Sequence, residues 1–535
     1  MSDREIVDAV IIGAGISGMY QLHKLRDELG LDVKVFEAGS GVGGTWYWNR
    51  YPGARFDSES YSYGYSFSDE LLEEWNWNEH FSPQPDNLKY LEFVADKFNL
   101  RPNIEFNTRV LAAHYDNDRN LWRITTDGGQ STSCKFLISA VGVLSTPFVP
   151  EIPGLENFKK PSWHTAEWPR ENVSLEGKRV GVIGTGATAV QMITEIAKNV
   201  GQLTVFQRTA NFCKPIGNRP ITAEEQVQIK KDYPKIFQRC RETFGSFLAD
   251  FEKKSAFDVT PEEREARYEE LWNEPGFGFW LGTYEDILTD PKANETQAEF
   301  VRNKIRSRVN DPKVAEMLCP KGHPFGTKRV PLENGYYEVY NQANVELVDI
   351  KNTPIEIVTE SGLRTTEQEF EFDILILATG FDTVTGSLDR IDIRGRDGLV
   401  LKDKWSDGPK TYLGMGSVGF PNLFTVVGPH NGATFCNIPR CIEQNVEWVS
   451  DCIKYLTEND ISRIEVNQDA EDEWTEHVQE VVKGTLFPEA DSWFMGANIP
   501  GKKRQMYLYA GGSPLYRETC DSVASNNYEG YTLEK

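Results

Sequence analysis

Two apolar runs of strand length, each followed by a glycine turn and a helical pattern, dominate the chain. The first unit, VDAVIIGAGISGMYQLHKLRDELG, spans 7–30, and the second, KRVGVIGTGATAVQMITEIAKNV, spans 178–200. After the glycines, apolar residues recur at the three- and four-residue intervals of a helix. Another strand-like run follows each unit, LDVKVFEA at 31–38 and QLTVFQRT at 202–209. This order predicts two βαβ units of the kind that binds dinucleotides.

The pattern changes between 221 and 318. Charged segments without strand-like runs begin there with Thr-x-Glu-Glu or Thr-Pro-Glu-Glu, which are helix-start signals. We therefore expect a helical insertion. Beyond it, EFDILILATGFD (371–382) and PNLFTVVGP (421–429) have the pattern of buried strands that meet glycine turns.

These elements predict an α/β fold with two Rossmann-like dinucleotide-binding domains and a helical insertion. Because strand-and-turn patterns resume near residue 373, we expect the chain to return there to its first domain. The predicted division has three parts. The first domain comprises 1–143 and 373–535, the second domain comprises 144–220 and 319–372, and the insertion is 221–318.

Composition narrows the possible partners. The formal charge of −24 over 535 residues argues against nucleic acid and membrane partners, since an acidic surface repels phosphates. Eight cysteines without a CxxC spacing favour a reduced compartment over a disulfide framework or a metal site, although Cys436 and Cys441 lie close in sequence. No run approaches the ~20 apolar residues of a membrane span, and no signal peptide is evident. We expect a cytoplasmic monomer.

The first glycine turn, GAGISG, places Gly13, Gly15 and Gly18 in the G-x-G-x-x-G arrangement. The first glycine allows the tight turn, the second lets the backbone approach a pyrophosphate, and the third permits close helix packing. Glu37 ends the next strand, where a carboxylate can bind both ribose hydroxyls. A coincidental glycine turn is the alternative. Because Glu37 would repel a 2′-phosphate, this site should hold FAD or NAD and not NADP.

The second glycine turn, GTGATA, has Gly184 and Gly186, with Ala189 in the third place. Its following strand ends in Arg208 instead of an acid, and a guanidinium can pair bidentately with a 2′-phosphate. A solvated surface arginine is the alternative for Arg208. A first site suited to FAD or NAD, together with a second site suited to NADPH, predicts a flavoprotein that uses NADPH. The candidate NADP-binding residues of this unit are Gly184, Thr185, Gly186, Ala187, Thr188, Arg208 and Thr209.

An aromatic stretch, GVGGTWYWNRYPGARFDSESYSY, occupies 41–63. Its small glycines can lie beside a cofactor, and its aromatic rings can wall a flat ring system, although an aromatic loop packed on the core is the alternative. Its candidate cofactor-binding residues are Gly44, Thr45, Trp46, Asp57 and Tyr63.

Lys328 and Arg329 are neighbours in KGHPFGTKRVPL at 321–332. In an extended segment, adjacent side chains point to opposite faces, so one can meet a nucleotide phosphate and the other the reacting centre. A solvated charge pair is the alternative.

Two longer motifs resemble those of type I Baeyer–Villiger monooxygenases, which are class B flavoprotein monooxygenases. The segment FKKPSWHTAEWP lies between the two glycine turns and is similar to the family pattern F-x-G-x-x-x-H-x-x-x-W-[PD]. Phe158, His164, Trp168 and Pro169 match it, while Lys160 replaces the glycine. A second pattern, [AG]-G-x-W-x-x-x-x-[FY]-P-[GM]-x-x-x-D, is met in full within the aromatic stretch. The resemblance covers nearly the whole chain and is closest to the phenylacetone and cyclohexanone monooxygenase branch.

The resemblance implies roles for individual residues. Arg329 matches the active-site arginine and Asp57 the carboxylate that positions it. Lys328 and Arg208 match residues that recognise the NADPH 2′-phosphate, and Trp493 matches a mobile-loop tryptophan that reaches the nicotinamide ribose. The implied substrate-pocket residues are Thr434, Phe435 and Cys436.

The implied activity is the insertion of one atom of O2 next to a ketone carbonyl through a C4a-peroxyflavin, giving an ester or lactone, with FAD and NADPH as cofactors. A permanently charged Arg329 suits an anionic peroxide. The main alternative is an N- or S-oxygenating flavin-containing monooxygenase, which shares the two-Rossmann plan but lacks the aromatic motif with Asp57 and Arg329.

The resemblance favours a linker role for His164 over that of a general base, although the ordinary pKa of histidine lies near neutrality. At position 160, a lysine with positive φ would cost roughly 1–2 kcal/mol. We predict that the turn has shifted instead, because the other motif is intact.

Overall fold

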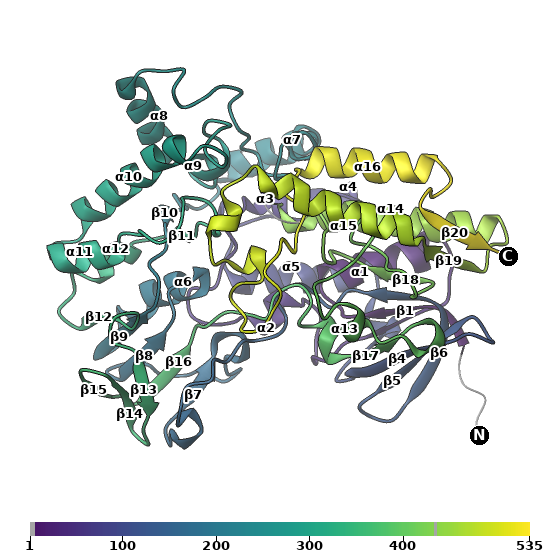
Figure 1. Cartoon of the computed structure of the whole chain (residues 1–535), viewed down its shortest axis with the longest axis horizontal. Coiled ribbons are helices and arrows are strands. Elements are labelled where there is room, and N and C mark those ends of the chain that lie inside the picture. The colour runs from purple at the N-terminus through teal and green to yellow at the C-terminus, as the bar shows by residue number, and fades with distance from the viewer. Residues whose placement is uncertain (1–5, 433–435) are drawn as a thin grey trace.

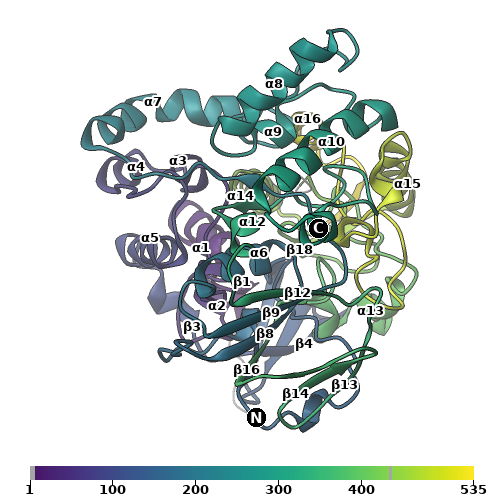
Figure 2. The same cartoon turned by 90° about the vertical axis from the view of Figure 1, so that its left-hand side faces the viewer.

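The computed structural model describes residues 6–432 and 436–535. Two sheets set the architecture, one on the right and one on the left of Figure 1. Helices from the middle and the end of the chain lie above both sheets, as the turned view in Figure 2 also shows. The C-terminus lies on the side of the first sheet. The predicted α/β fold is confirmed.

The first sheet has the strand order β17-β4-β5-β6-β1-β2-β3, and β18 also pairs with β6. Its strands are β1 (Ile6–Ile12), β2 (Val33–Phe36), β3 (Ile104–Glu105), β4 (Val110–Asp116), β5 (Leu121–Thr126), β6 (Ser131–Ser139), β17 (Asp392–Arg394) and β18 (Leu423–Thr425). The central strand β1 pairs in parallel with β2 and β6. Its continuous apolar run fits this position, because a central parallel strand is covered on both faces.

The second sheet is wholly parallel, with the order β12-β9-β8-β16-β7. Its strands are β7 (Ser162–His164), β8 (Arg179–Ile183), β9 (Gln202–Gln207), β12 (Val345–Asp349) and β16 (Ile374–Leu377). A small antiparallel sheet, β13 (Ile355–Val358), β14 (Gly362–Thr365) and β15 (Glu369–Glu371), follows β12 along the chain.

One predicted boundary is wrong. The strand β16 lies in the second sheet, between β8 and β7, so the chain does not return to the first domain at residue 373. A buried strand followed by a glycine turn has the same pattern in either sheet, and only the pairing distinguishes them. The remainder of the division stays a prediction.

The segment 221–318 contains five helices. They are α7 (Ala223–Glu242), α8 (Pro261–Asn273), α9 (Gly278–Leu281), α10 (Pro291–Arg308) and α11 (Pro312–Leu318). The helices α7 and α8 begin where the sequence signals predict, each with a capping box, formed by Thr222 with Glu225 and by Thr260 with Glu263. The prediction that this insertion is helical is confirmed.

Helices of both glycine units and of the C-terminal part of the chain surround the sheets. They include α1 (Ile16–His23), α5 (Gln84–Lys97), α6 (Ala187–Ile196), α14 (Ile438–Glu458), α15 (Gln468–Lys483) and α16 (Ser513–Ser525). The long helix α14 packs along α1 and α16. Among the described residues, no helix combines the length and apolar character that crossing a membrane requires.

Candidate active site

The first glycine turn joins β1 to α1 and has the geometry that its glycines predict. Gly13 adopts φ +104°, and a Cβ there would lie 2.5 Å from the carbonyl oxygen of Ala140. A Cβ on Gly18 would lie 1.8 Å from the Gly13 carbonyl oxygen. Larger residues would therefore push α1 away from the strand, and the turn would no longer present its backbone N–H groups at the helix N-terminus.

Glu37 follows β2 and lies beside this turn. One carboxylate oxygen accepts a hydrogen bond from the backbone N–H of Ala14 at 2.8 Å, and the other accepts from Gly39 at 2.6 Å. Burial raises the pKa of Glu37, while these two hydrogen bonds lower it. Each oxygen retains a second lone pair, so the carboxylate can still accept a ribose hydroxyl.

The second glycine turn joins β8 to α6 in the same way. Gly184 adopts φ +117°, and a Cβ there would meet the Ala378 carbonyl oxygen at 2.3 Å. A Cβ on Gly186 would meet nothing within 4 Å, so the backbone at this glycine faces open space. Ala187 and Thr188 begin α6, and the Thr185 hydroxyl donates to the Thr209 carbonyl at 2.8 Å.

Arg208 is exposed directly after β9, and Lys328 approaches it from a distant part of the sequence. Burial lowers the pKa of Lys328, the charge of Asp491 opposes this effect, and the charge of Arg208 adds to it. Such interactions require proximity. The structure thus brings together two cations that the sequence separates by more than one hundred residues.

Arg329 pairs with Asp57, as the sequence predicts. The Nη2 of Arg329 donates to Oδ1 of Asp57 at 2.5 Å, and the side chain of Asp57 is 11% exposed against 32% for Arg329. The guanidinium carbon also lies 5.2 Å from the centre of the Phe277 ring. A buried carboxylate and an aromatic face therefore fix a guanidinium that remains partly open to the site.

Aromatic rings of the stretch 41–63 pack beside this ion pair. The Trp46 indole N–H donates to the Tyr63 hydroxyl at 3.1 Å, and the rings of Phe56 and Tyr63 stack at 4.0 Å. Burial and the charge of Asp57 raise the pKa of Tyr63, which stays protonated. A small apolar hollow, in which about 10 Å3 can hold the centre of a water molecule, is lined by Ile16 and by aromatic side chains that include Trp46 and Tyr63.

The aromatic stretch also contacts the first glycine turn. A Cβ on Gly44, whose φ is +51°, would lie 2.8 Å from the Cα of Gly15. The two backbones approach so closely that neither position accepts a side chain without displacement. Thr45 follows as the exposed first residue of α2 (Thr45–Trp48).

Two residues of this region were not predicted from the sequence. Gln191 on α6 accepts from the Tyr51 hydroxyl at 2.9 Å and donates to the Arg55 carbonyl at 2.9 Å, which ties the aromatic stretch to the second glycine unit. Phe277 reaches Arg329 from the helical insertion. Neither residue belongs to a motif, so no sequence signal marks them.

His164 ends β7 and is buried, with 3% of its surface exposed. Its Nδ1 accepts from the backbone N–H of Ala166 at 3.1 Å, and its ring meets Phe381 edge-on. Burial lowers the pKa of His164 to about 4, although the nearby Gly380 backbone opposes this effect. These contacts lie where the chain leaves β16, which supports the predicted linker role.

The rest of the histidine segment anchors the same region. Trp168 is buried with its ring 5.6 Å from that of Trp163, and Phe158 packs on the core of the second sheet. Lys160 does not adopt positive φ. Its Nζ donates to the Phe372 carbonyl at 2.8 Å, just before β16. The lysine therefore replaces the family's glycine without backbone strain.

Trp493 lies partly buried in the short helix Trp493–Met495. The segment after it is fixed near the end of β16, because Asn498 donates to the Phe381 carbonyl at 2.9 Å. Lys502 pairs with Asp382 at 2.8 Å. The candidate nicotinamide-side residue thus belongs to a segment that contacts the turn beside His164.

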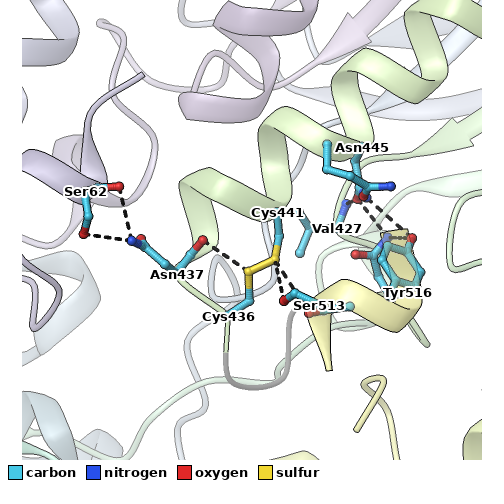
Figure 3. Close-up of a disulfide and its surroundings, with 11 residues drawn as sticks. Ser62, Val427, Cys436, Asn437, Cys441, Asn445, Ser513 and Tyr516 are labelled. Atoms are coloured by element: carbon cyan, nitrogen blue, oxygen red, sulfur yellow. Dashed lines mark hydrogen bonds between the residues drawn. A yellow bond between two sulfur atoms is a disulfide. The ribbon is translucent and has the colours of Figure 1, made fainter. Parts of the chain in front are cut away.

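The substrate-pocket prediction is only partly within the described residues. Thr434 and Phe435 lie outside them. Cys436 forms a disulfide with Cys441, with the two Cα atoms 6.5 Å apart, and Asn437 donates to the Ser62 hydroxyl at 3.0 Å (Figure 3). The expectation of reduced cysteines is therefore wrong for this pair, because the start of α14 turns Cys441 back toward Cys436, which spacing alone does not show.

Comparisons with known proteins agree with this geometry. A family model described as flavin-binding monooxygenase-like matches residues 7–215. Cyclohexanone 1,2-monooxygenase of an Acinetobacter species is 44% identical over 100% of this chain and 98% of its own length. A phenazine N-monooxygenase of Lysobacter antibioticus is 42% identical over 99% of this chain and 98% of its own.

Solved structures support the same relationship. The crystal structure of OTEMO in complex with FAD and NADP is 46% identical and superposes with a TM-score of 0.96, covering 99% of this chain and 100% of that one. Full-length identity to ketone monooxygenases, together with both motifs and the Arg329–Asp57 pair, shows the family. The chain belongs to the Baeyer–Villiger monooxygenases.

Proposed function

We propose that this chain is an NADPH- and FAD-dependent enzyme that inserts one oxygen atom of O2 next to a ketone carbonyl. The balanced reaction is ketone, O2, NADPH and one proton giving an ester or lactone, NADP+ and water. The observation that carries this proposal is the Arg329–Asp57 pair, placed beside the aromatic stretch that contacts the first glycine turn.

The residues present fit both cofactors. For FAD, the contact between Gly15 and Gly44 leaves backbone without side chains beside the first turn, and Glu37 retains acceptors for ribose hydroxyls. For NADPH, the open space at Gly186 gives a pyrophosphate access to the N-terminus of α6. When bound, FAD supplies the redox chemistry that activates O2, and NADPH supplies the electrons.

Arg208 and Lys328 are proposed to bind the NADPH 2′-phosphate. Two cations that destabilise each other in the protein alone gain a shared partner when a dianion lies between them. Thr209 is fixed beside them through its carbonyl contact with Thr185. Trp493 is proposed to cover the nicotinamide end, because its segment contacts the turn after β16.

Arg329 is proposed to stabilise negative charge on oxygen at the reacting centre. Its guanidinium is permanently charged, and Asp57 on one side and the Phe277 ring on another limit its rotamers. The carboxylate is the more buried partner, and the Arg329 side chain keeps 32% of its surface exposed, which leaves N–H groups available to a ligand. Cys436 and the unplaced Thr434 and Phe435 stay candidates for the pocket wall.

The purified, FAD-loaded protein should be incubated with NADPH, O2 and a panel of cyclic and linear ketones. We expect mass spectrometry to detect esters or lactones carrying 18O from 18O2. A tertiary amine and a thioether in parallel reactions test the N- or S-oxygenating alternative. NADPH consumption that gives only H2O2 with every ketone would refute the proposed activity.

A cytoplasmic monomer stays a proposal. Six of the cysteines among the described residues are free and buried, which favours a reduced compartment, whereas the Cys436–Cys441 disulfide does not. Light scattering of the purified protein tests the monomer, since a mass near twice 60.8 kDa would exclude it.

A further inference from the structure

A second hollow lies among α7, α14 and α16, apart from the residues assigned above. It is open to solvent: its empty space is about 300 Å3 when the mouth is counted, of which about 10 Å3 can hold the centre of a water molecule. Three arginines from three different helices line it, namely Arg241 near the end of α7, Arg440 near the start of α14 and Arg517 on α16. Its other polar lining residues are Ser66 and, on α14, Glu443, Gln444 and Glu447. We call it the arginine hollow.

One arginine and one glutamate neutralise each other. Arg440 Nη1 pairs with Glu443 Oε2 at 2.8 Å, and both side chains are almost completely buried. Ser66 donates to Glu443 through its backbone N–H at 2.6 Å and through its hydroxyl at 2.5 Å. The Arg440 guanidinium also donates to the Gly64 carbonyl. Its Nε is buried without a hydrogen-bond partner among the described residues. An unpaired buried donor of this kind needs an acceptor.

Of the other two arginines, Arg241 is exposed and Arg517 is half-buried. Over residues 6–432 and 436–535, neither the Arg241 nor the Arg517 guanidinium donates a hydrogen bond or forms an ion pair. Burial lowers the pKa of Arg517, and the neighbouring charge of Arg241 lowers it further, while the charges of Glu447 and Asp521 raise it. Arg517 therefore repels Arg241 across the hollow. This repulsion is the opposite of what a surface arginine gains from a nearby carboxylate.

Glu447 is the remaining acid and compensates the two arginines poorly. Burial and the neighbouring charge of Glu443 raise its pKa, while the charges of Arg517 and Arg241 lower it. Tyr20 donates to Glu447 at 3.3 Å. With both glutamates ionised, the hollow holds three positive charges against two negative ones, in a chain whose net charge is −24.

We propose that the arginine hollow binds a phosphate dianion, either free or as the terminal group of a phosphomonoester, between Arg241 and Arg517. A tetrahedral phosphate presents several oxygens, and each guanidinium offers a planar fork that can bind two of them. The Arg440 guanidinium lies in the same wall, 4.6 Å from the centre of the Phe237 ring, and adds a third positive charge. The proposal does not depend on the enzyme's activity.

Calorimetric titration of the FAD-loaded protein tests the site. Saturating NADP+ is present throughout, so that the nucleotide phosphate site is filled. Inorganic phosphate and glycerol 1-phosphate are titrated separately, with chloride at matched ionic strength as the blank. We expect saturable binding with one phosphate per chain. Binding of both ligands assigns the site to a phosphomonoester, and binding of inorganic phosphate alone assigns it to the free ion.

Variants make the result specific. Arg241→Gln combined with Arg517→Gln should weaken phosphate binding at least tenfold, which corresponds to about 1.4 kcal/mol. The matched control Arg119→Gln, at an exposed arginine after β4, should leave binding unchanged. Glu447→Gln should tighten binding several-fold, because it removes a competing negative charge. A purely structural role for Glu447 does not predict this gain.

Two results would overturn the proposal. One is the absence of any saturable heat beyond the chloride blank in the unaltered protein. The other is unchanged phosphate affinity in the Arg241→Gln, Arg517→Gln variant, with FAD content and circular dichroism showing that it is folded. Because every readout is binding, failure to oxidise ketones would leave this outcome unaffected.

Discussion

Arg329 owes its orientation to residues that lie far from it in sequence. Asp57 belongs to the aromatic stretch and Phe277 to the helical insertion, and the two reach the guanidinium from separate parts of the chain. An arginine with two fixed neighbours loses less side-chain entropy when it binds a charged oxygen than a free one does. Its position is therefore decided before any substrate arrives.

Asp57→Asn tests this orientation. The amide keeps the shape of the carboxylate but loses the charge-assisted hydrogen bond, so we expect ester formation to slow about 10- to 100-fold, or roughly 1.4–2.7 kcal/mol. NADPH oxidation should continue, with more of its electrons recovered as H2O2. The matched control Asp392→Asn, on the edge strand β17, should change neither rate. Equal ester yields in Asp57→Asn and the unaltered enzyme would contradict the assigned role.

Arg208→Gln tests the nucleotide preference. Removing this exposed cation should raise KM for NADPH about tenfold, roughly 1.4 kcal/mol, because one of two partners of the 2′-phosphate is lost. KM for NADH should stay within a factor of two, since NADH lacks that phosphate. Steady-state kinetics with both nucleotides provide the measurement and its internal control. A parallel rise in both KM values would place Arg208 outside the phosphate site.

At the scale of the element, β16 joins the histidine segment to the second glycine unit. It pairs on one side with β8 and on the other with β7, whose last residue is His164. Lys160 adds a bond to the chain just before β16. The histidine segment is thus part of the second sheet, and its side chains hold an edge strand in register.

Lys160→Gly should have a small effect on catalysis. Because Lys160 has ordinary φ, glycine relieves no strain, and its greater backbone freedom together with the lost Phe372 bond should destabilise the fold by about 1–2 kcal/mol. We expect the ratio of ester to H2O2 to change less than threefold. Chemical denaturation and product analysis measure the two effects. A tenfold change in that ratio would show that position 160 controls coupling.

Sequence patterns predicted helices and strands better than they predicted which strands pair and which cysteines form a disulfide. The two βαβ units and the capped helices α7 and α8 follow from local signals, since strand, turn and cap depend on near neighbours. The sheet that receives β16 depends on pairing between strands about two hundred residues apart. The bond between Cys436 and Cys441 depends on how a loop enters α14. Local patterns carry neither kind of information.

At the scale of the whole molecule, three buried histidines make the fold sensitive to acid. Burial lowers the pKa of His164 to about 4 and those of His323 and His430 to about 3. The positive charge of Lys328 lowers that of His323 further. The unfolded chain takes up protons near pH 6.5, where the folded chain stays neutral. The stability contributed by the neutral rings is therefore present above about pH 6.5 and is lost as the pH falls toward 4.

His164→Asn should flatten this dependence. Asparagine can accept a hydrogen bond from the Ala166 N–H in place of Nδ1, but it does not titrate. The variant therefore takes up one proton fewer when it unfolds in this pH range. Between pH 6.5 and 4 the free energy of unfolding of the variant should fall less steeply, by about 1.4 kcal/mol per pH unit. Urea unfolding at several pH values gives both slopes. Identical slopes would show that His164 is protonated in the folded protein.

The contact between Arg329 and Asp57 is the one that the family resemblance implies, and the two glycine turns have the geometry that their motifs predict. The roles of these residues in binding and catalysis stay predictions. Gln191 and Phe277 were not predicted, because each makes a contact between distant parts of the chain and occurs in a segment of ordinary composition. When a residue's role arises only from a tertiary contact, the sequence around it contains no pattern that marks it.

The interleaving of the two sheets has a consequence for biosynthesis. The ribosome releases β8 and β7 long before β16, which pairs with both of them, and β6 long before its partner β18. Neither sheet can be completed until most of the polypeptide has been translated. The nascent chain therefore carries open strand edges that invite association with other chains. A gene fragment ending at residue 372 should yield an aggregating product, and its solubility should depend on chaperone supply.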